Sequence, residues 1–166
     1  MFESALEAGF VAAGFDVYML GPLPTPGIAY ITNSFDANLG VVISASHNPF
    51  FDNGIKFFDR SGSKLTDEVE YQIEEHLKNR AITLESQSLG KAKRIDTARV
   101  RYQDFCVNSM PDGMDLEGLK VVFDGANGAC YKVGPRTLMS LGAEVIPIGC
   151  SPNGKNINDA CGSTQP

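Results

Sequence analysis

GVVISASHNP, residues 40–49, joins an apolar run to a short polar loop. The first four residues are typical of a buried strand, and Asp52-Asn53-Gly54 after the loop indicates a turn. Pro49 removes a backbone donor and disfavours the helical conformation at Asn48, so we expect a stiff loop. A stiff loop holds a reacting group in place, and Ser46 is the candidate reactive hydroxyl.

Ser46 alone does not define a hydrolase. A serine nucleophile needs an adjacent base, a metal or a helix terminus to activate it. The G-x-S-x-G frame is absent, because Ser44 and Asn48 stand where the glycines belong. Serine and asparagine after a strand also satisfy turns through side-chain-to-backbone hydrogen bonds, so a purely structural loop is the alternative.

His47 and Lys56 are two further candidate functional side chains that follow this serine in the sequence. Lys56 lies in the short apolar run Ile55–Phe58, where strand alternation puts it on the same face as Phe58. A lysine there suits a general acid/base or a phosphate ligand, and the alternative is a lysine that protects an edge strand. His47 is a candidate donor to a phosphate or a sugar oxygen.

Size and charge limit the classes of partner. The 166 residues, 43% of them hydrophobic, are enough for one ordinary domain or two small ones. Lysine and arginine number 14 against 20 acidic residues, and the net charge of −6 argues against nucleic acid or an anionic membrane as partner. No apolar stretch is long enough to span a bilayer, and the first residues do not resemble a signal peptide.

The cysteines indicate a reducing compartment. The four cysteines form no C-x-x-C pair, and with two histidines in the chain a zinc site is not expected. We interpret them as reduced thiols of a cytoplasmic protein, with a Cys150–Cys161 disulfide as the alternative.

Helices alternate with short apolar strands along the chain. This alternation is typical of an α/β fold. A helical pattern that starts at Phe2 without a capping residue, and a polar loop at the last residues, predict a fold truncated at both ends. Thr25 is expected to cap the second helix, with Pro26 at its first position. The expected helices are 2–14, 28–33, 66–80, 97–108 and 135–141, and the expected strands are 16–20, 39–44, 55–58, 119–123 and 144–148.

Weak periodicity and a shift in composition over 81–96 predict a domain boundary. We expect a first unit at 1–90 with the serine loop, a linker and connecting helix at 91–114, and the start of a second unit at 115–166. The second unit reads as one βαβ motif. Its glycine-rich segment 124–129 is interpreted as a packing turn, with a phosphate cradle as the alternative, and the oxygen-rich segment 153–159 is interpreted as a loop.

Residues 40–58 closely resemble the catalytic segment of the α-D-phosphohexomutases. Within that superfamily, the chain is most similar to the bacterial members that act on hexosamine phosphates, and members acting on glucose or mannose phosphates are the alternative. Five further segments agree, in order: 3–9, 21–26, 124–129, 156–158 and 161–164.

The resemblance implies a phosphotransfer reaction. Ser46 would be a phosphoserine that gives its phosphoryl group to glucosamine 6-phosphate, and the resulting 1,6-bisphosphate would return its other phosphoryl group and leave glucosamine 1-phosphate. By the same resemblance Ser46, His47 and Lys56 are catalytic, and Asn48 and Asn53 bind substrate. Mg²⁺ would be held through the Ser46 phosphate and three aspartates of a D-x-D-x-D loop, and a hexose 1,6-bisphosphate would serve as intermediate and activator.

The chain departs from the family pattern in several respects, among them a missing N-terminal basic loop. It has no D-x-D-x-D loop, and it also lacks the later sugar-specificity loop and the arginine-rich phosphate-binding domain. The resemblance therefore implies most of domain 1 and the beginning of domain 2 of an enzyme of amino-sugar metabolism, inactive or nearly so as an isolated mutase. It also implies a fold of three layers, α/β/α, with a mixed sheet. The expected partner is a small-molecule sugar phosphate. A non-catalytic sugar-phosphate-binding module and a poorly folded remnant are the alternatives, and the sequence leaves the oligomeric state open.

Overall fold

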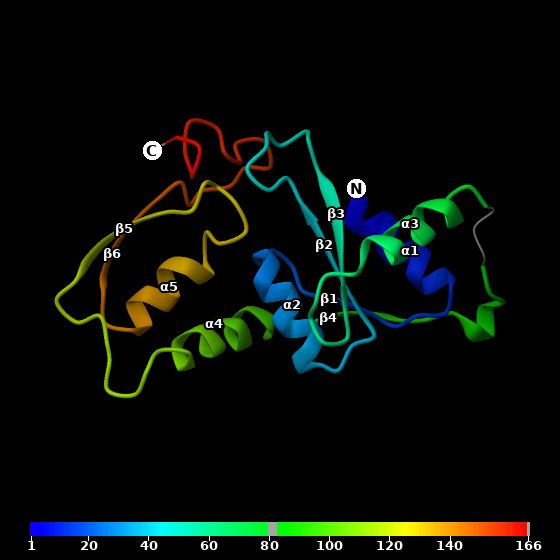
Figure 1. The fold of residues 1–166 in the computed structure, drawn as a ribbon, viewed down its shortest axis with the longest axis horizontal. Helices are drawn as coiled ribbons and strands as arrows, with labels where there is room; N and C mark the ends of the chain where they lie inside the picture. Colours follow the sequence, from blue (N-terminus) through cyan, green and yellow to red (C-terminus); the bar gives the residue numbers. More distant parts are fainter. Residues whose placement is uncertain (80–82, 166) are drawn as a thin grey trace.

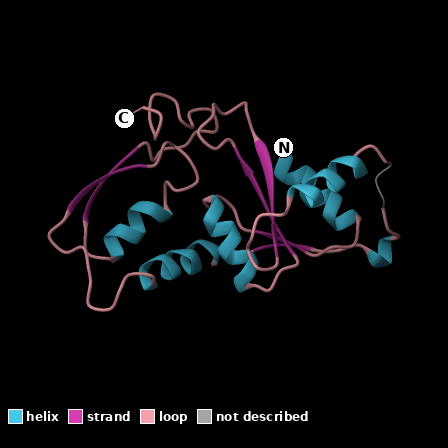
Figure 2. Ribbon diagram, viewed as in Figure 1, coloured by secondary structure: helices cyan, strands magenta, loops and turns pink. Residues whose placement is uncertain are grey.

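A computed structural model describes residues 1–79 and 83–165 of the chain. Helices and short strands alternate, which confirms the predicted α/β class (Figures 1 and 2). The helices are α1 (Phe2–Ala12), α2 (Thr25–Ser34), α3 (Asp67–His76), α4 (Ala98–Asn108) and α5 (Val133–Ser140), with a short 3₁₀ turn at Ser86–Ser88. The strands are β1 (Val17–Met19), β2 (Leu39–Ser44), β3 (Gly54–Asp59), β4 (Ala92–Arg94), β5 (Lys120–Asp124) and β6 (Glu144–Ile148).

The strands pair in twos. β1 and β4 are parallel, β2 and β3 are antiparallel, and β5 and β6 are parallel, so both kinds of pairing occur but no single described sheet combines them. In the described residues, the pairs form three separate two-stranded sheets. The hairpin of β2 and β3 runs in register from Leu39 opposite Asp59 to Ser44 opposite Gly54. The serine loop therefore lies at the open tip of this hairpin, where the two strands have just separated.

The bounds of all five described helices differ from the sequence-based ones, with α1 ending at Ala12 and α4 beginning at Ala98, two residues and one residue inside the expected ranges. Thr25 is not the cap of α2: Pro24 occupies that position, and its carbonyl accepts the N–H groups of Gly27 and Ile28 at 2.8 and 3.2 Å. A proline suits that extended position because its φ is fixed near −65°. The helix α3 ends at His76, and residue 80, its expected end, lies outside the described residues. The helix α5 begins at Val133, two residues earlier than expected.

The strand β4 was not predicted. Its residues pair with β1 from Val17 opposite Ala92 to Met19 opposite Arg94, and the Asp16 carboxylate accepts the Lys91 N–H at 2.8 Å. All three β4 residues are exposed, so the segment lacks the apolar alternation that marks a strand. The stretch expected to be a domain boundary thus includes a strand paired with the first unit, while residues 81 and 82 of that stretch lie outside the described residues.

The main core lies around α2, between β2 and α4. Thr32 on α2 packs so closely against β2 that a Cβ at Gly40 would lie 2.0 Å from the Thr32 hydroxyl oxygen. On the other side of α2, the rings of Tyr30 and Phe105 stack with centroids 4.1 Å apart. The buried core residues are Leu23, Ile28, Ile31, Val42, Phe58 and Ala98. This core fixes β2 and so the position at which the serine loop begins.

The second unit is the predicted βαβ motif, β5–α5–β6. The helix α5 packs against α4, and the Gln103 side-chain amide donates to the Ser140 hydroxyl at 3.0 Å. α4 therefore contacts both α2 and α5 and connects the two units. None of the helices in the described part of the chain is long and apolar enough to cross a membrane.

Candidate functional site

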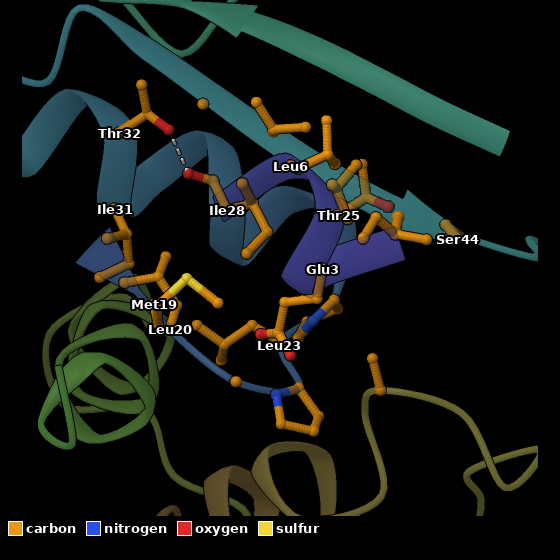
Figure 3. A pocket seen from close by; sticks show the side chains of 18 of the residues that line it. Glu3, Leu6, Met19, Leu20, Leu23, Thr25, Ile28, Ile31, Thr32 and Ser44 are labelled. Atoms are coloured by element: carbon orange, nitrogen blue, oxygen red, sulfur yellow. Dashed lines mark hydrogen bonds between the residues drawn. The ribbon is translucent and has the colours of Figure 1, made fainter. Parts of the chain in front are cut away.

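A large open cavity of about 1610 Å³ runs from the underside of α1 to the serine loop. Its inner end is mainly apolar, where side chains of α1, β1, α2 and the loop between β1 and α2 converge, with Glu3 among them (Figure 3). This apolar end comprises Leu6, Met19, Leu20, Leu23, Ile28 and Ile31. The opposite, polar mouth is formed by three segments that are distant in sequence: the serine loop with the end of β2, the turn after β5, and the segment after β6. It comprises Ser44, Ser46, His47, Asn53, Asn127, Asn158 and Gly162.

The serine loop is a tight turn closed by hydrogen bonds among its own residues. The Ser46 N–H donates to the Ser44 hydroxyl at 2.9 Å, and the Asn48 N–H donates to the Ala45 carbonyl at 2.9 Å. Ser46 has a φ of 54°, in the left-handed region that non-glycine residues occupy at a cost of about 1 to 3 kcal/mol. Residues held in such conformations cluster at functional sites, and this one is the hydroxyl that the sequence singles out.

His47 is the titratable side chain closest to the serine hydroxyl in this loop. Its Nδ1 lies 3.5 Å from Ser46 Oγ, at the outer limit of a hydrogen bond. Both residues are exposed at the cavity mouth. The arrangement leaves the serine oxygen open to an incoming phosphorus atom and places an imidazole beside it.

Asn48 and Asn53, the expected substrate ligands, occupy different places. Asn53 lines the cavity, and its amide donates to the Phe50 carbonyl at 2.8 Å, which helps to close the turn. Asn48 is half-buried and does not line the cavity. Their roles as substrate ligands stay predictions.

Lys56 is not brought to the cavity. It lies on β3 opposite Val42, exposed to solvent and outside the lining of the cavity. The loop returns to the hairpin at Gly54, so Lys56 already follows the strand away from the tip. The structure therefore brings Ser46, His47 and Asn53 together, and the acid/base role of Lys56 stays a prediction.

The glycine-rich turn after β5 forms the facing side of the mouth. The Asp124 carboxylate accepts the N–H groups of Ala126 and Gly162 at 2.8 and 2.7 Å, and these bonds, that from Ala126 first, lower the pKa of the carboxyl group. A Cβ at Gly125 would lie 2.7 Å from the Cys150 sulfur. Close packing and internal hydrogen bonds agree with the interpretation of this segment as a packing turn.

Asn158 is the polar residue of the mouth that sequence reasoning missed. Its side-chain amide donates to the Ser46 carbonyl at 3.0 Å and to the Asn48 carbonyl at 2.8 Å. In Figure 1 the orange-red segment near the C-terminus lies beside the tip of the β2–β3 hairpin. The richness of 153–159 in asparagine was visible in the sequence, but no local pattern identifies a partner 112 residues away.

The four cysteines are free thiols, so no Cys150–Cys161 disulfide is formed. Burial raises the pKa of the Cys130 thiol, which favours its protonated, unreactive form.

The described residues do not make a magnesium site by themselves. No group of three or more histidine, cysteine, aspartate or glutamate side chains in 1–79 and 83–165 is arranged to hold a metal ion. A phosphate on Ser46 would contribute oxygen ligands of the kind that Mg²⁺ prefers, and the Mg²⁺ site stays a prediction.

The family model for "Phosphoglucomutase/phosphomannomutase, alpha/beta/alpha domain I" matches residues 1–83. The chain belongs to the phosphoglucomutase/phosphomannomutase family. A solved structure of a phosphoglucomutase/phosphomannomutase family protein from Burkholderia thailandensis superposes with a TM-score of 0.72 and 26% identity, covering 92% of this chain and 33% of that one.

Among curated proteins, the similarity is to phosphoglucosamine mutases. The phosphoglucosamine mutase of Polaromonas naphthalenivorans is 57% identical over 166 residues, which are all of this chain and 38% of that protein. Phosphoglucosamine mutase 1 of Shewanella amazonensis is 57% identical over 165 residues, 99% of this chain and 37% of that protein. The chain therefore spans well under half the length of these relatives.

Proposed function

We propose that this chain is the serine-bearing part of a phosphoglucosamine mutase, which interconverts glucosamine 6-phosphate and glucosamine 1-phosphate. The observation that carries the proposal is Ser46: it lies at the mouth of a large cavity, in a left-handed conformation, with an imidazole beside its hydroxyl. The 57% identity to phosphoglucosamine mutases supports the choice of the amino sugar over glucose or mannose.

In the proposed reaction Ser46 carries the phosphoryl group. The bond from phosphorus to Ser46 Oγ breaks as a bond to the 1-hydroxyl oxygen of glucosamine 6-phosphate forms, and the hydroxyl proton passes to a base. The resulting 1,6-bisphosphate turns over and returns its 6-phosphoryl group to Ser46. His47 is supported as a proton carrier by its distance of 3.5 Å from Oγ, while Lys56 is proposed in the same role only from the resemblance.

Binding of the sugar phosphate is proposed for Asn48 and Asn53, of which Asn53 has the direct support of lining the cavity. We propose Mg²⁺ as a cofactor and hexose 1,6-bisphosphate as intermediate and activator of the complete mutase. Of the described residues, only a phosphorylated Ser46 would contribute to a Mg²⁺ site. The four free thiols support a cytoplasmic location.

We further propose three segments: 1–90 with the serine loop, 91–114 with the connecting helix, and 115–166 as the start of a second unit. The family match to 1–83 supports the first, and the contacts of α4 with both α2 and α5 support a connecting role for that helix.

The test is phosphorylation of the chain itself. The purified chain is incubated with a hexose 1,6-bisphosphate, and its intact mass is measured. We expect the mass of one added phosphate, lost in Ser46→Ala and retained in the control Ser61→Ala, which removes an exposed hydroxyl at the other end of the hairpin. Mutase turnover by the isolated chain is expected to be absent or nearly so.

The second candidate function, a non-catalytic sugar-phosphate-binding module, is favoured by the cavity alone. It predicts that hexose phosphate binds with equal affinity to the parent chain and to Ser46→Ala, and that no phosphate is added. That pair of results would replace the mutase proposal.

A further inference from the structure

The side-chain amide of Asn158 joins two segments that are more than a hundred residues apart. Its nitrogen donates to the Ser46 carbonyl at 3.0 Å and to the Asn48 carbonyl at 2.8 Å. An asparagine amide has two N–H hydrogens, and both are used here. Since both partners are carbonyl oxygens, which only accept, the amide must present its nitrogen to the serine loop.

These two bonds act on the Ser46–His47 and Asn48–Pro49 peptide units, whose carbonyls belong to the residues before and after His47. Within the serine loop, the N–H groups of Ser46 and Asn48 are already used by Ser44 and Ala45. The backbone acceptors of the same two residues, the Ser46 and Asn48 carbonyls, both bind the Asn158 side-chain amide. The left-handed conformation of Ser46 is thus held from one side by the loop itself and from the other side by Asn158.

Asn158 is itself fixed by the turn after β5. Its backbone N–H donates to the Ala126 carbonyl at 2.9 Å, and the neighbouring Asn156 carbonyl accepts the Asn127 side-chain amide at 3.3 Å. The Asp124 carboxylate at the end of β5 accepts the N–H groups of Ala126 and of Gly162, so it binds both the turn after β5 and the segment that contains Asn158. Hydrogen bonds therefore connect the end of β5 to the serine loop through one side chain.

We propose that Asn158 is a positioning residue for Ser46: its amide fixes the main chain on both sides of His47 and so keeps the Ser46 hydroxyl at the cavity mouth. The role assigned to that hydroxyl rests on the proposed function, whereas the restraint on the main chain does not. Asn158 acts on the backbone of the reacting residue and needs no contact with the substrate.

The experiment replaces the donor and keeps the shape. Asn158→Asp preserves the size of the side chain and its tolerance of the positive φ of 57°, but it offers the two carbonyls no N–H group. The matched control is Asn153→Asp, in the same loop: Asn153 accepts the Lys155 N–H through Oδ1, and aspartate preserves that bond. Both variants add the same charge.

The first readout is local. Hydrogen exchange of the peptide covering 44–50 is expected to be about tenfold faster in Asn158→Asp, in line with the loss of two hydrogen bonds, and unchanged in Asn153→Asp. The ¹³C signals of the Ser46 and Asn48 carbonyls are expected to shift in the first variant alone. Parent-like exchange and parent-like carbonyl signals in Asn158→Asp would overturn the proposal.

The second readout separates positioning from binding. With hexose 1,6-bisphosphate as donor, Asn158→Asp is expected to lower the maximal rate of Ser46 phosphorylation about tenfold, with the half-saturating donor concentration unchanged. A rise in the half-saturating concentration at an unchanged maximal rate would also overturn the proposal. If the parent chain takes up no phosphate, the proposed function fails, and the exchange and carbonyl signals alone decide on the restraint.

A second variant covers a loss of folding. Asn158→Gly adopts the positive φ without strain and also lacks the amide. If α2 and β2 lose protection from exchange in Asn158→Asp, both readouts are taken from Asn158→Gly, with the same expected and contradicting results.

Discussion

The two ends of the large cavity are built in different ways. The apolar end is formed by regular elements, α1, β1 and α2, with buried side chains such as Ile28 and Ile31. The polar mouth is formed by irregular loops, and its residues Ser46, Asn127 and Asn158 all have positive φ. The apolar end depends on volume and burial, whereas the mouth depends on a few directed hydrogen bonds and on backbone strain. Mutations at the two ends should therefore fail in different ways.

The largest effect is expected at the apolar end. Ile31→Ala removes most of a side chain that is only 3% exposed, and we expect the free energy of unfolding to fall by about 2 to 4 kcal/mol. Urea denaturation measures this loss, with Ser34→Ala on the exposed side of the same helix as control. A loss no larger than that of the control would show that the apolar end does not support the fold.

A smaller loss is expected where α2 approaches β2. In Gly40→Ala the added methyl group would collide with the Thr32 hydroxyl, and we expect a loss of about 1 to 3 kcal/mol from overpacking. Thr32→Ala removes the nearest atoms, so the double variant should be more stable than the sum of the two single losses predicts. Strict additivity in the denaturation midpoints would rule out this contact.

At the mouth, the smaller residue is expected to be the more stabilising one. Glycine adopts a positive φ freely, whereas alanine does not, so Ser46→Gly should be about 1 kcal/mol more stable to unfolding than Ser46→Ala. Both variants lack the hydroxyl and should take up no phosphate. Equal stabilities of the two variants would mean that Ser46 carries no backbone strain.

The smallest effect is a dependence of stability on pH. Hydrogen bonds from Ala126 and Gly162 hold the pKa of Asp124 below its ordinary value of 3.8. The ionised carboxylate therefore stabilises the fold above pH 3.8, and this contribution is lost as the pH falls through the lower pKa of the folded state. The stability difference between the parent and Asp124→Asn should shrink as the pH falls through that range. A difference independent of pH would contradict this role of the carboxylate.

The elements with clear periodicity could be predicted from the sequence. The bounds of β2 and β6 agree with the expectation, because their apolar runs end at polar residues or glycine. The strand β4 could not be predicted, since three exposed residues become a strand only by pairing with β1. The prediction that Thr25 caps α2 was wrong. Pro24 is the N-cap residue, and its backbone carbonyl accepts the first helical N–H groups without any side-chain cap.

The site divides in the same way. Ser46, His47 and Asn53 come together because one short loop contains all three, which the sequence shows directly. The position of Lys56 depends on the residue at which β3 begins. Because β3 begins at Gly54, Lys56 is already two residues along the strand and does not line the cavity. Asn158 could not be found, because its partners are set by the packing of the second unit against the hairpin and by no local pattern.

The two-stranded sheets have a practical consequence. With one partner each among the described strands, β5 and β6 both keep a free row of backbone donors and acceptors. Val122 in β5 and Ile146 in β6 are 62% and 43% exposed. Such a margin is a template onto which another copy can add a strand. We expect self-association to rise with protein concentration, so light scattering over a dilution series should set the working range before any of the variants is compared.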